Sequence, residues 1–358
     1  MAAAILPAGF VFFHTERFSL LGSRFVTEFT SVYCEREFMQ DSRAIQSRSG
    51  LDPKVNREMK SSQKGDSMSQ VIRLFRGILP VVALSVLLLA NISAQAQRGS
   101  ITFMQINVPG SASTELDGIN NWGEIAGYFV DQSGKQHGVI DRNGVFTQLD
   151  FPGATATRTV GINNLGDLVG FFTDSSGAQH GLFHAFGRFS QLDFPGATAT
   201  QALGINDELQ IVGSFTDASG NVHSFLESLG VFTQFDFPGG TNTISFGIND
   251  FGEIAGSFVD AMGIQHAFRK QGGIFTEINP PGSVTSVVFG LNLLGNLVGS
   301  FTDAAGNGHG FFDKAGSFVQ VDFPGAASTD ANGVNAFGFF VGDFFDASGV
   351  EHGYFAIR

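Results

Sequence analysis

The sequence predicts an all-β protein built as a ring of six units, and three observations lead to this prediction. One stretch of 43 residues occurs six times without insertion or deletion, with copies that start at Phe103, Phe146, Phe189, Phe232, Phe275 and Phe318. Each copy has three tight-turn signals that separate four short apolar segments. No window has the apolar period of a helix, and the 47 glycines are too many for a helical protein. Four antiparallel strands in about 40–45 residues make one propeller blade, so we predict a six-bladed β-propeller.

Glycines at fixed places mark the turns of each copy. In the second copy, Pro152-Gly153 predicts a type II turn, because proline presets φ and glycine supplies a positive φ. Asn163–Gly166 indicates a short hairpin loop closed by a glycine bulge, and Asp174–Gly177 a second hairpin. A third turn ends at Gly187. The third copy departs from this pattern, with Leu209 where the first hairpin glycine is expected.

These turns predict where the strands lie and how the ring closes. In the second copy we expect strands at 157–163, 167–173, 180–184 and 188–194. When each blade is taken to begin after a Pro-Gly turn, the segment Phe103–Val108 has no blade before it. The last copy, which ends at Arg358, then lacks its fourth strand. We therefore expect the first strand to complete the last sheet, since open sheet edges invite aggregation. An open solenoid of stacked units is the alternative.

The chain before the repeats contains a signal-peptide pattern. Residues 68–96 combine arginines, an apolar run at 78–89, and the small residues Ala94 and Ala96 at the −3 and −1 positions. We expect cleavage after Ala96, secretion by a bacterial cell to the envelope or outside, and a mature repeat domain at 97–358. The alternative is an uncleaved membrane anchor.

Residues 1–67 carry no repeat. A signal peptide does not work from position 68, so we expect Met68 to be the natural start and residues 1–67 to lie outside the natural product. A genuine disordered leader is the alternative. The only cysteine, Cys34, lies in this segment, so disulfides cannot stabilise the mature domain.

The expected mature domain is strongly acidic. It has nine Lys and Arg against 25 Asp and Glu, a formal charge of −16. Such a surface, without basic clusters, argues against nucleic acid and anionic membranes as partners. The partner classes left open are a glycan and an extracellular protein or peptide, and the sequence leaves the oligomeric state undecided. No membrane span is expected in the mature form.

Phenylalanine is the main apolar residue, with 40 in the chain against three Tyr and one Trp. One strand position is Phe in every copy, at Phe129, Phe172, Phe215, Phe258, Phe301 and Phe344. We expect these rings to pack between neighbouring sheets, where such side chains bury roughly 150–250 Å² each. An aromatic array that binds a cofactor is the alternative, and we expect no cofactor.

An aspartate and a histidine repeat six residues apart across the second hairpin. The pairs are Asp131 and His137, Asp174 and His180, Asp217 and His223, Asp260 and His266, Asp303 and His309, and Asp346 and His352. We interpret them as structural: the Asp caps its turn through backbone N–H groups, and the His pairs with it or with nearby backbone. A ring of metal sites is the alternative, but one Asp and one His per blade are too few ligands, so we expect no metal site.

A hydroxyl and an amide also repeat. The hydroxyls follow each Pro-Gly turn at Thr114, Thr157, Thr200, Thr243, Ser286 and Thr329, and the amides are Asn120, Asn163, Asn206, Asn249, Asn292 and Asn335. Both suit turn and strand capping. Alternatively, the threonines, aspartates and histidines form one polar face of the disc that binds a sugar or a peptide.

Enzyme sites need one set of groups and should break the symmetry of the repeat. Trp122 and His184 are the non-repeating candidates, and neither has a neighbouring nucleophile, a GxSxG elbow or metal-ligand spacing. We find no catalytic residues in the sequence and interpret Trp122 as a hairpin-packing residue.

The repeat resembles the HAF family of extracellular repeats. The resemblance lies in Gly161–Gly170, GINNLGDLVG, and in His266–Phe268, the His-Ala-Phe that only the fourth copy has at this repeat position; most other copies read His-Gly and then an apolar residue there. It covers all six copies and implies export and a β-rich repeat fold, with no established activity.

Two functions remain. Every polar feature found repeats and none converges, which favours a non-enzymatic extracellular binding or scaffold module. A carbohydrate-active enzyme that uses the propeller channel is the alternative.

Overall fold

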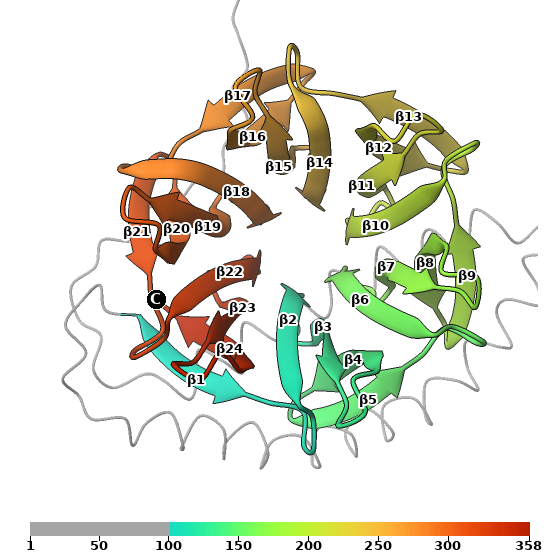
Figure 1. Ribbon diagram of the computed structural model, residues 1–358, viewed down its shortest axis with the longest axis horizontal. Coiled ribbons are helices and arrows are strands. Elements are labelled where there is room, and N and C mark those ends of the chain that lie inside the picture. The colour runs from blue at the N-terminus through green and yellow to red at the C-terminus, as the bar shows by residue number, and fades with distance from the viewer. Residues whose placement is uncertain (1–100) are drawn as a thin grey trace, which may run out of the picture. The chain divides into compact units, whose positions relative to one another are not determined.

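The computed structural model describes residues 101–358, which form six four-stranded sheets arranged around a central opening (Figure 1). All 24 elements of this part of the chain are β-strands. The predicted fold class, a six-bladed β-propeller, is confirmed. The predicted leader, signal peptide and cleavage residues Ala94 and Ala96 lie outside the described residues.

The first three blades are complete meanders. Blade 1 contains β2 (Ser113–Ile119), β3 (Ile125–Val130), β4 (Gln136–Arg142) and β5 (Val145–Leu149). Blade 2 contains β6 (Ala156–Ile162), β7 (Leu168–Thr173), β8 (Gln179–Ala185) and β9 (Arg188–Leu192). Blade 3 contains β10 (Ala199–Ile205), β11 (Ile211–Thr216), β12 (Val222–Ser228) and β13 (Val231–Phe235).

The other three blades follow the same order, except that the last is shared between the two ends of the described chain. Blade 4 contains β14 (Thr241–Ile248), β15 (Ile254–Val259), β16 (Gln265–Gln271) and β17 (Ile274–Ile278). Blade 5 contains β18 (Ser283–Leu291), β19 (Leu297–Asp303), β20 (Gly308–Lys314) and β21 (Ser317–Val321). Blade 6 contains β22 (Ser328–Val334), β23 (Phe340–Phe345), β24 (Glu351–Ile357) and β1 (Thr102–Ile106).

The turns are those that the glycines predict. Gly153 has a φ of 83° after Pro152, as a type II turn requires, and Gly166 has a φ of 80° at the end of the first hairpin. Leu209 adopts a φ of 58° in the third copy, so the same hairpin is kept without glycine. The observed strands agree with the predicted ones to within one or two residues at each end.

The expected ring closure is also confirmed. β1 pairs antiparallel with β24, from Thr102 opposite Ile357 to Ile106 opposite Gly353. The Phe103 ring packs edge-on against Tyr354, with ring centroids 5.4 Å apart. The first strand of the described chain is therefore the outer strand of the last sheet (Figure 1).

Six buried asparagines join the blades to one another. The amide Nδ2 of Asn120 donates to the backbone carbonyl of Asn163 at 3.1 Å, and each later copy repeats this bond to the next blade. Asn335 donates to the Asn120 carbonyl at 3.2 Å, which completes the circle. The Oδ1 atom of each asparagine accepts backbone N–H groups of its own hairpin, the expected capping role. The contact between blades was not predicted.

The repeated phenylalanines are core residues, as predicted. Their exposed fractions range from 4 % to 8 %. The Phe172 ring stacks on Phe151 with centroids 3.7 Å apart, and its other neighbour is the His180 ring at 5.2 Å. Similar stacks recur in other blades. The core thus consists of aromatic columns between sheets rather than one central cluster.

Removal of the closing strand should destabilise the whole domain. Deleting residues 97–109 leaves the β24 edge unpaired and uncovers Tyr354, so we expect a lower melting temperature and association of the protein. Differential scanning calorimetry and light scattering measure both effects, and deletion of residues 1–67 is the control that should change neither. An unchanged melting temperature and monomeric state would support the open solenoid.

The asparagine ring should contribute measurable stability. Asn206→Asp keeps an oxygen that caps the hairpin but removes the donor to the Asn249 carbonyl, so we expect the free energy of unfolding to fall by about 1–3 kcal/mol. Urea denaturation provides the measurement. Glu208→Gln, an exposed change in the same loop, is the control. Equal stability of the two variants would show that the contact between blades contributes nothing.

Candidate functional site

The repeated aspartates cap their turns. Asp131 Oδ1 accepts the backbone N–H of Ser133 at 2.8 Å and that of Lys135 at 3.0 Å. The other five aspartates accept the same two N–H groups of their own turns. The Ser133 hydroxyl, followed by the Lys135 N–H, lowers the pKa of Asp131 below its ordinary value. These carboxylates are therefore ionised turn caps, as expected.

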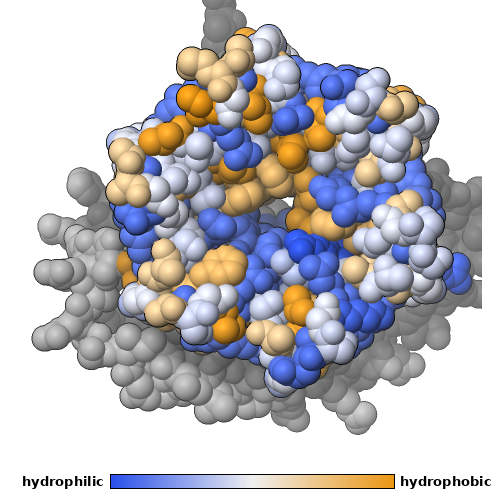
Figure 2. All heavy atoms as spheres, in the orientation of Figure 1, coloured by the Kyte–Doolittle hydropathy of each residue, from blue (hydrophilic) through white to orange (hydrophobic). Residues whose placement is uncertain are grey.

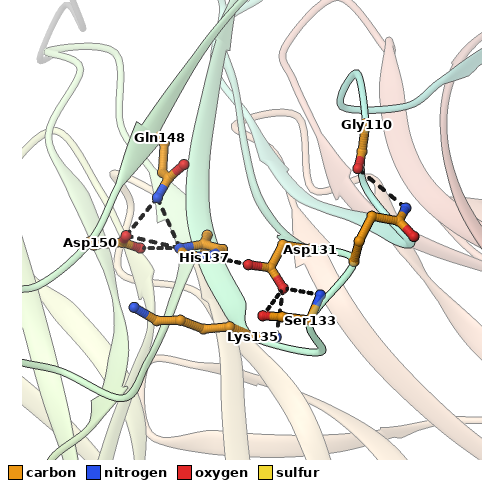
Figure 3. Close-up of polar contacts among 8 residues, drawn as sticks. Gly110, Asp131, Ser133, Lys135, His137, Gln148 and Asp150 are labelled. Carbon is orange, nitrogen blue, oxygen red and sulfur yellow. Dashed lines mark hydrogen bonds and ion pairs between the residues drawn. The ribbon is translucent and has the colours of Figure 1, made fainter.

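Each histidine bridges that aspartate to a second partner, which the sequence analysis missed. His137 Nε2 lies 3.3 Å from Asp131 Oδ2, and its Nδ1 lies 2.8 Å from Asp150 Oδ2 (Figure 3). The amide of Gln148 contacts both His137 and Asp150. In blades 2 to 5 the second partners of the histidines are Asp193, Asp236, Glu277 and Asp322. In blade 6 the Asn107 amide takes this place, 3.1 Å from His352 Nδ1.

The contacts of each histidine with its two partners use most of the polar atoms with which these side chains could bind a ligand. Burial alone lowers the pKa of His180, but the hydrogen bonds and charges of Asp193 and Asp174 outweigh it, and the net pKa is raised. His309 behaves in the same way between Asp322 and Asp303. The arrangement supports the structural interpretation of the Asp–His pairs, and ligand binding by them stays a prediction.

The threonines of the alternative polar face lie inside the blades. Thr157, Thr200 and Thr243 are at most 2 % exposed. Their hydroxyl oxygens accept the backbone N–H of Phe151, Phe194 and Phe237, the residues before the Pro-Gly turns. These hydrogen bonds are those of the capping interpretation, and the burial of the three side chains inside the blade argues against the surface-binding alternative, which stays a prediction.

A different site lies at the axis of the ring. A pocket with a volume of about 390 Å³ is lined by the innermost strands of all six blades, β2, β6, β10, β14, β18 and β22. Seven ionisable side chains gather on one side of it, and we call them the axial pocket residues: Glu115, Asp117, Tyr128, Arg158, Asp330, Asp343 and Glu351. They come from blades 6, 1 and 2.

The axial pocket breaks the symmetry of the repeat. The position of Glu115 is Gln201, Ile244 and Val287 in blades 3, 4 and 5. The position of Asp117 is Leu203, Phe246 and Phe289 in those same blades, and the last two rings pack edge-on at 5.1 Å. Figure 2 shows this division, with hydrophilic residues below the central opening and hydrophobic residues along its upper rim.

Four carboxyl groups of the axial pocket, those of Asp117, Asp330, Asp343 and Glu351, have raised pKa values. Burial, followed by the charges of Glu115 and Asp343, raises the pKa of Asp117 well above its ordinary value. Burial and the charge of Glu115 also raise the pKa of Asp343, and they raise that of Glu351 to about 7. Like charges in a low-dielectric site disfavour joint ionisation, so these groups hold their protons to a higher pH than isolated carboxyl groups do.

Three side chains partly compensate the negative charge of the axial carboxylates. The Tyr128 hydroxyl donates to Glu115, and burial next to that carboxylate raises the pKa of Tyr128, so the phenol stays protonated. The Arg158 guanidinium lies 3.9 Å from the centre of the Tyr128 ring. The Asn332 amide donates to Asp343 at 2.8 Å. Asp117 Oδ2 is buried and accepts no hydrogen bond from residues 101–358.

No family model matches the chain, and no curated protein matches it. The resemblance to the HAF family therefore rests only on the residues quoted above.

Solved structures with a similar architecture were found at low sequence identity. AofleA from Arthrobotrys oligospora is 10 % identical, with 74 % of this chain and 89 % of that chain covered and a TM-score of 0.49. The Aleuria aurantia lectin, described as a six-bladed β-propeller that recognises fucose, is 10 % identical, with 72 % and 91 % covered and a TM-score of 0.43. TolB from Acinetobacter baumannii is 11 % identical, with 66 % and 64 % covered and a TM-score of 0.48. The architecture of this chain is taken from its own strand pairing.

The interpretation that no polar feature converges is wrong, because among the non-repeating residues it considered Trp122 and His184 but none of the carboxyl groups. The signal that reveals the axial pocket is the opposite one: positions where charge appears in one to three copies and is absent from the others. Asp330, in the sixth copy, and Glu115, in the first, hold the same repeat position, and ring closure makes their blades neighbours.

Within residues 101–358 no group of three or more His, Cys, Asp or Glu side chains has a geometry that could hold a metal ion. The same range contains no helix of the length and hydrophobicity needed to span a membrane.

The axial carboxyl groups make the stability of the domain depend on pH. The pKa of Glu351 is raised from 4.5 to about 7 on folding, so its contribution is fully present below pH 4.5 and is lost as the pH rises through about 7. We expect a higher melting temperature at pH 5 than at pH 8. The turn aspartates, whose pKa values are lowered, titrate below this window.

Glu351→Gln isolates this contribution, because the amide cannot ionise. We expect the variant to be more stable than the parent at pH 8 by about 1–2 kcal/mol, after allowance for solvent screening, and no more stable at pH 5. Thermal unfolding of both proteins across this range measures the difference. A difference that does not change with pH would contradict the assigned ionisation.

Proposed function

We propose that the protein is a secreted bacterial binding module that takes one cationic solute in its axial pocket. The observation that carries the proposal is the convergence of five carboxyl groups and a single arginine on one side of a cavity at the ring axis. Because the site occurs once per ring, it fits a single ligand better than the six Asp–His networks do. Export follows from the signal-peptide pattern and from the family resemblance.

The charge balance specifies the sign of the ligand. Fully ionised, the axial pocket would hold five negative charges against the positive charge of Arg158, and the raised pKa values express the free-energy cost of that excess. An ammonium group placed among the carboxylates would reduce this cost and form charge-assisted hydrogen bonds. Anionic ligands are disfavoured for the same reason.

The opposite wall specifies the rest of the ligand. Leu203, Phe246 and Phe289 offer apolar surface across the pocket from the carboxyl groups. A ligand with a charged amine and an aliphatic or aromatic body matches both walls, since pockets combine apolar lining with a few polar groups that fix orientation. A lysine side chain of an extracellular peptide and an amino sugar of a glycan both contain such an amine.

Calorimetric titration of residues 97–358 with 1,5-diaminopentane tests the proposal. We expect saturable binding that weakens with added salt, because the attraction is electrostatic. The neutral analogue 1,5-pentanediol should not bind. Asp117→Asn should weaken diamine binding by roughly tenfold or more, and the variant should fold, because it removes a carboxyl group whose ionisation is opposed by burial and by neighbouring carboxylates.

Glu208→Gln is the matched control, since it removes one negative charge from an exposed hairpin outside the pocket and should leave affinity unchanged. Equal affinity of the diamine and the diol, or equal effects of the two substitutions, would contradict the proposal. Turnover of chromogenic glycosides that Glu351→Gln abolishes would favour the alternative, a carbohydrate-active enzyme.

Export is tested separately from ligand binding. Expressed from Met68 in a bacterium, the protein should leave the cytoplasm and begin at Gln97, which N-terminal sequencing of the exported product measures. A cytoplasmic product that retains residues 1–67 would contradict this part of the proposal.

A further inference from the structure

A second cavity lies at the junction of blades 1 and 2, away from the axial pocket. It has a volume of about 400 Å³, and we call it the blade 1–2 groove, lined mainly by Trp122, Glu124, Arg142, Asp167, His184 and Phe186. Its residues come from the β2–β3 and β4–β5 hairpins of blade 1 and the corresponding hairpins of blade 2. Consecutive antiparallel turns alternate between faces, so the groove opens on the face opposite the Asp–His turns.

Trp122 presents an exposed aromatic surface in a fixed orientation. Its side chain is 63 % exposed, and its indole N–H donates to the Asn164 carbonyl of the next blade at 2.9 Å. The same position is Leu165, Glu208 and Leu294 in blades 2, 3 and 5, and an exposed phenylalanine, Phe251 or Phe337, in blades 4 and 6, so what is particular to this junction is an indole ring. The expected role of Trp122 in hairpin packing accounts for the hydrogen bond but not for the exposed ring.

Phe186 supplies a second aromatic ring that the fold does not require. It is 98 % exposed and has a φ of 51°, a left-handed conformation that glycine and asparagine adopt at lower cost. Asn143 holds this turn position in blade 1 with a φ of 56°. A phenylalanine here is unfavourable both for the backbone and for contact with water, which suggests that it contacts something else.

Polar groups complete the groove. Arg142 Nε donates to Glu124 Oε1 at 2.7 Å, and this bond leaves the terminal nitrogens of the guanidinium able to face a ligand. The Glu124 carboxylate is partly exposed and accepts from Asn120 and Arg142, which leaves it lone pairs for a ligand hydroxyl, whereas Asp167 is buried beneath the groove. The groove therefore offers donors and acceptors beside aromatic surface, with little net charge among its ionised groups.

We propose that the blade 1–2 groove binds a neutral sugar unit of a glycan. A pyranose has an apolar C–H face that can pack on the Trp122 ring and hydroxyls at its edges that need both donors and acceptors, which Arg142 and Glu124 provide. The groove is large enough for one or two such units. This site is independent of the cation site proposed at the ring axis.

Tryptophan fluorescence tests the proposal directly, because Trp122 is the only tryptophan in the chain. The domain 97–358 is titrated with maltose, cellobiose, lactose and chitobiose up to their solubility limits. We expect at least one disaccharide to produce a saturable change in the emission. Asp117→Asn should give the same titration curve, which separates this site from the axial pocket.

Three variants taken from other blades make the test specific. Phe186→Asn copies the blade 1 turn and should fold normally while weakening sugar binding by roughly tenfold. Leu229→Asn makes the same change in the equivalent turn of blade 3, where Leu229 is 93 % exposed with a φ of 54°, and should leave the affinity unchanged. Trp122→Leu copies blade 2 and should abolish the saturation-transfer NMR signal of the sugar.

No saturable emission change with any of the four disaccharides would overturn the proposal. Equal affinities of Phe186→Asn and Leu229→Asn would overturn it as well, since the binding would then lie outside the groove.

Discussion

The ring of asparagine hydrogen bonds is the contact on which the rest of the structure depends. Each asparagine binds its own hairpin through Oδ1 and the next blade through Nδ2, so one side chain sets both the local turn and the position of the neighbour. All six are buried, where an unpaired amide would be costly. A change of length within the innermost strand before the asparagine would shift it away from the carbonyl it must reach.

Closure of the ring also creates the axial pocket. The bond from Asn335 to Asn120 and the pairing of β1 with β24 place blade 6 beside blade 1. Asp330 and Asp343 then lie close enough to Glu115 for its charge to raise their pKa values, although more than 200 residues separate them in the sequence. Repulsion among these groups opposes closure, and the asparagine ring and the strand pairing must outweigh it. A bound cation would reduce this repulsion and so would also stabilise the closed ring.

Much of the architecture could be predicted because its signals are local and repeated six times. Pro152-Gly153 and Asn163–Gly166 specify turns through backbone conformations that few residues adopt, and the strands follow from the spaces between turns. Asp150 as the partner of His137 could not be predicted in this way, because a cross-strand pair 13 residues apart depends on register. The burial of Thr157 likewise depends on which strand face meets the next blade.

The candidate sites were hidden for the opposite reason. Repetition drew attention to the Asp–His pairs, whereas the axial pocket and the blade 1–2 groove consist of residues that differ between copies. Glu115 and Trp122 stand out when each position is compared across the six copies, but only the structure shows that Glu115 meets Asp343 across the closing blades. Departures from a repeat are therefore the more informative signal for a single site.

Proton exchange on ligand binding tests most directly the claim that ring closure builds a cation site from carboxyl groups with raised pKa values. Calorimetric titration with 1,5-diaminopentane at pH 7, in two buffers that differ in ionisation enthalpy, measures the number of protons exchanged. An ammonium group that enters the axial pocket favours the ionised forms of Glu351 and its neighbours, so the account predicts net proton release and a binding enthalpy that depends on the buffer. A binding enthalpy that is the same in both buffers would contradict it.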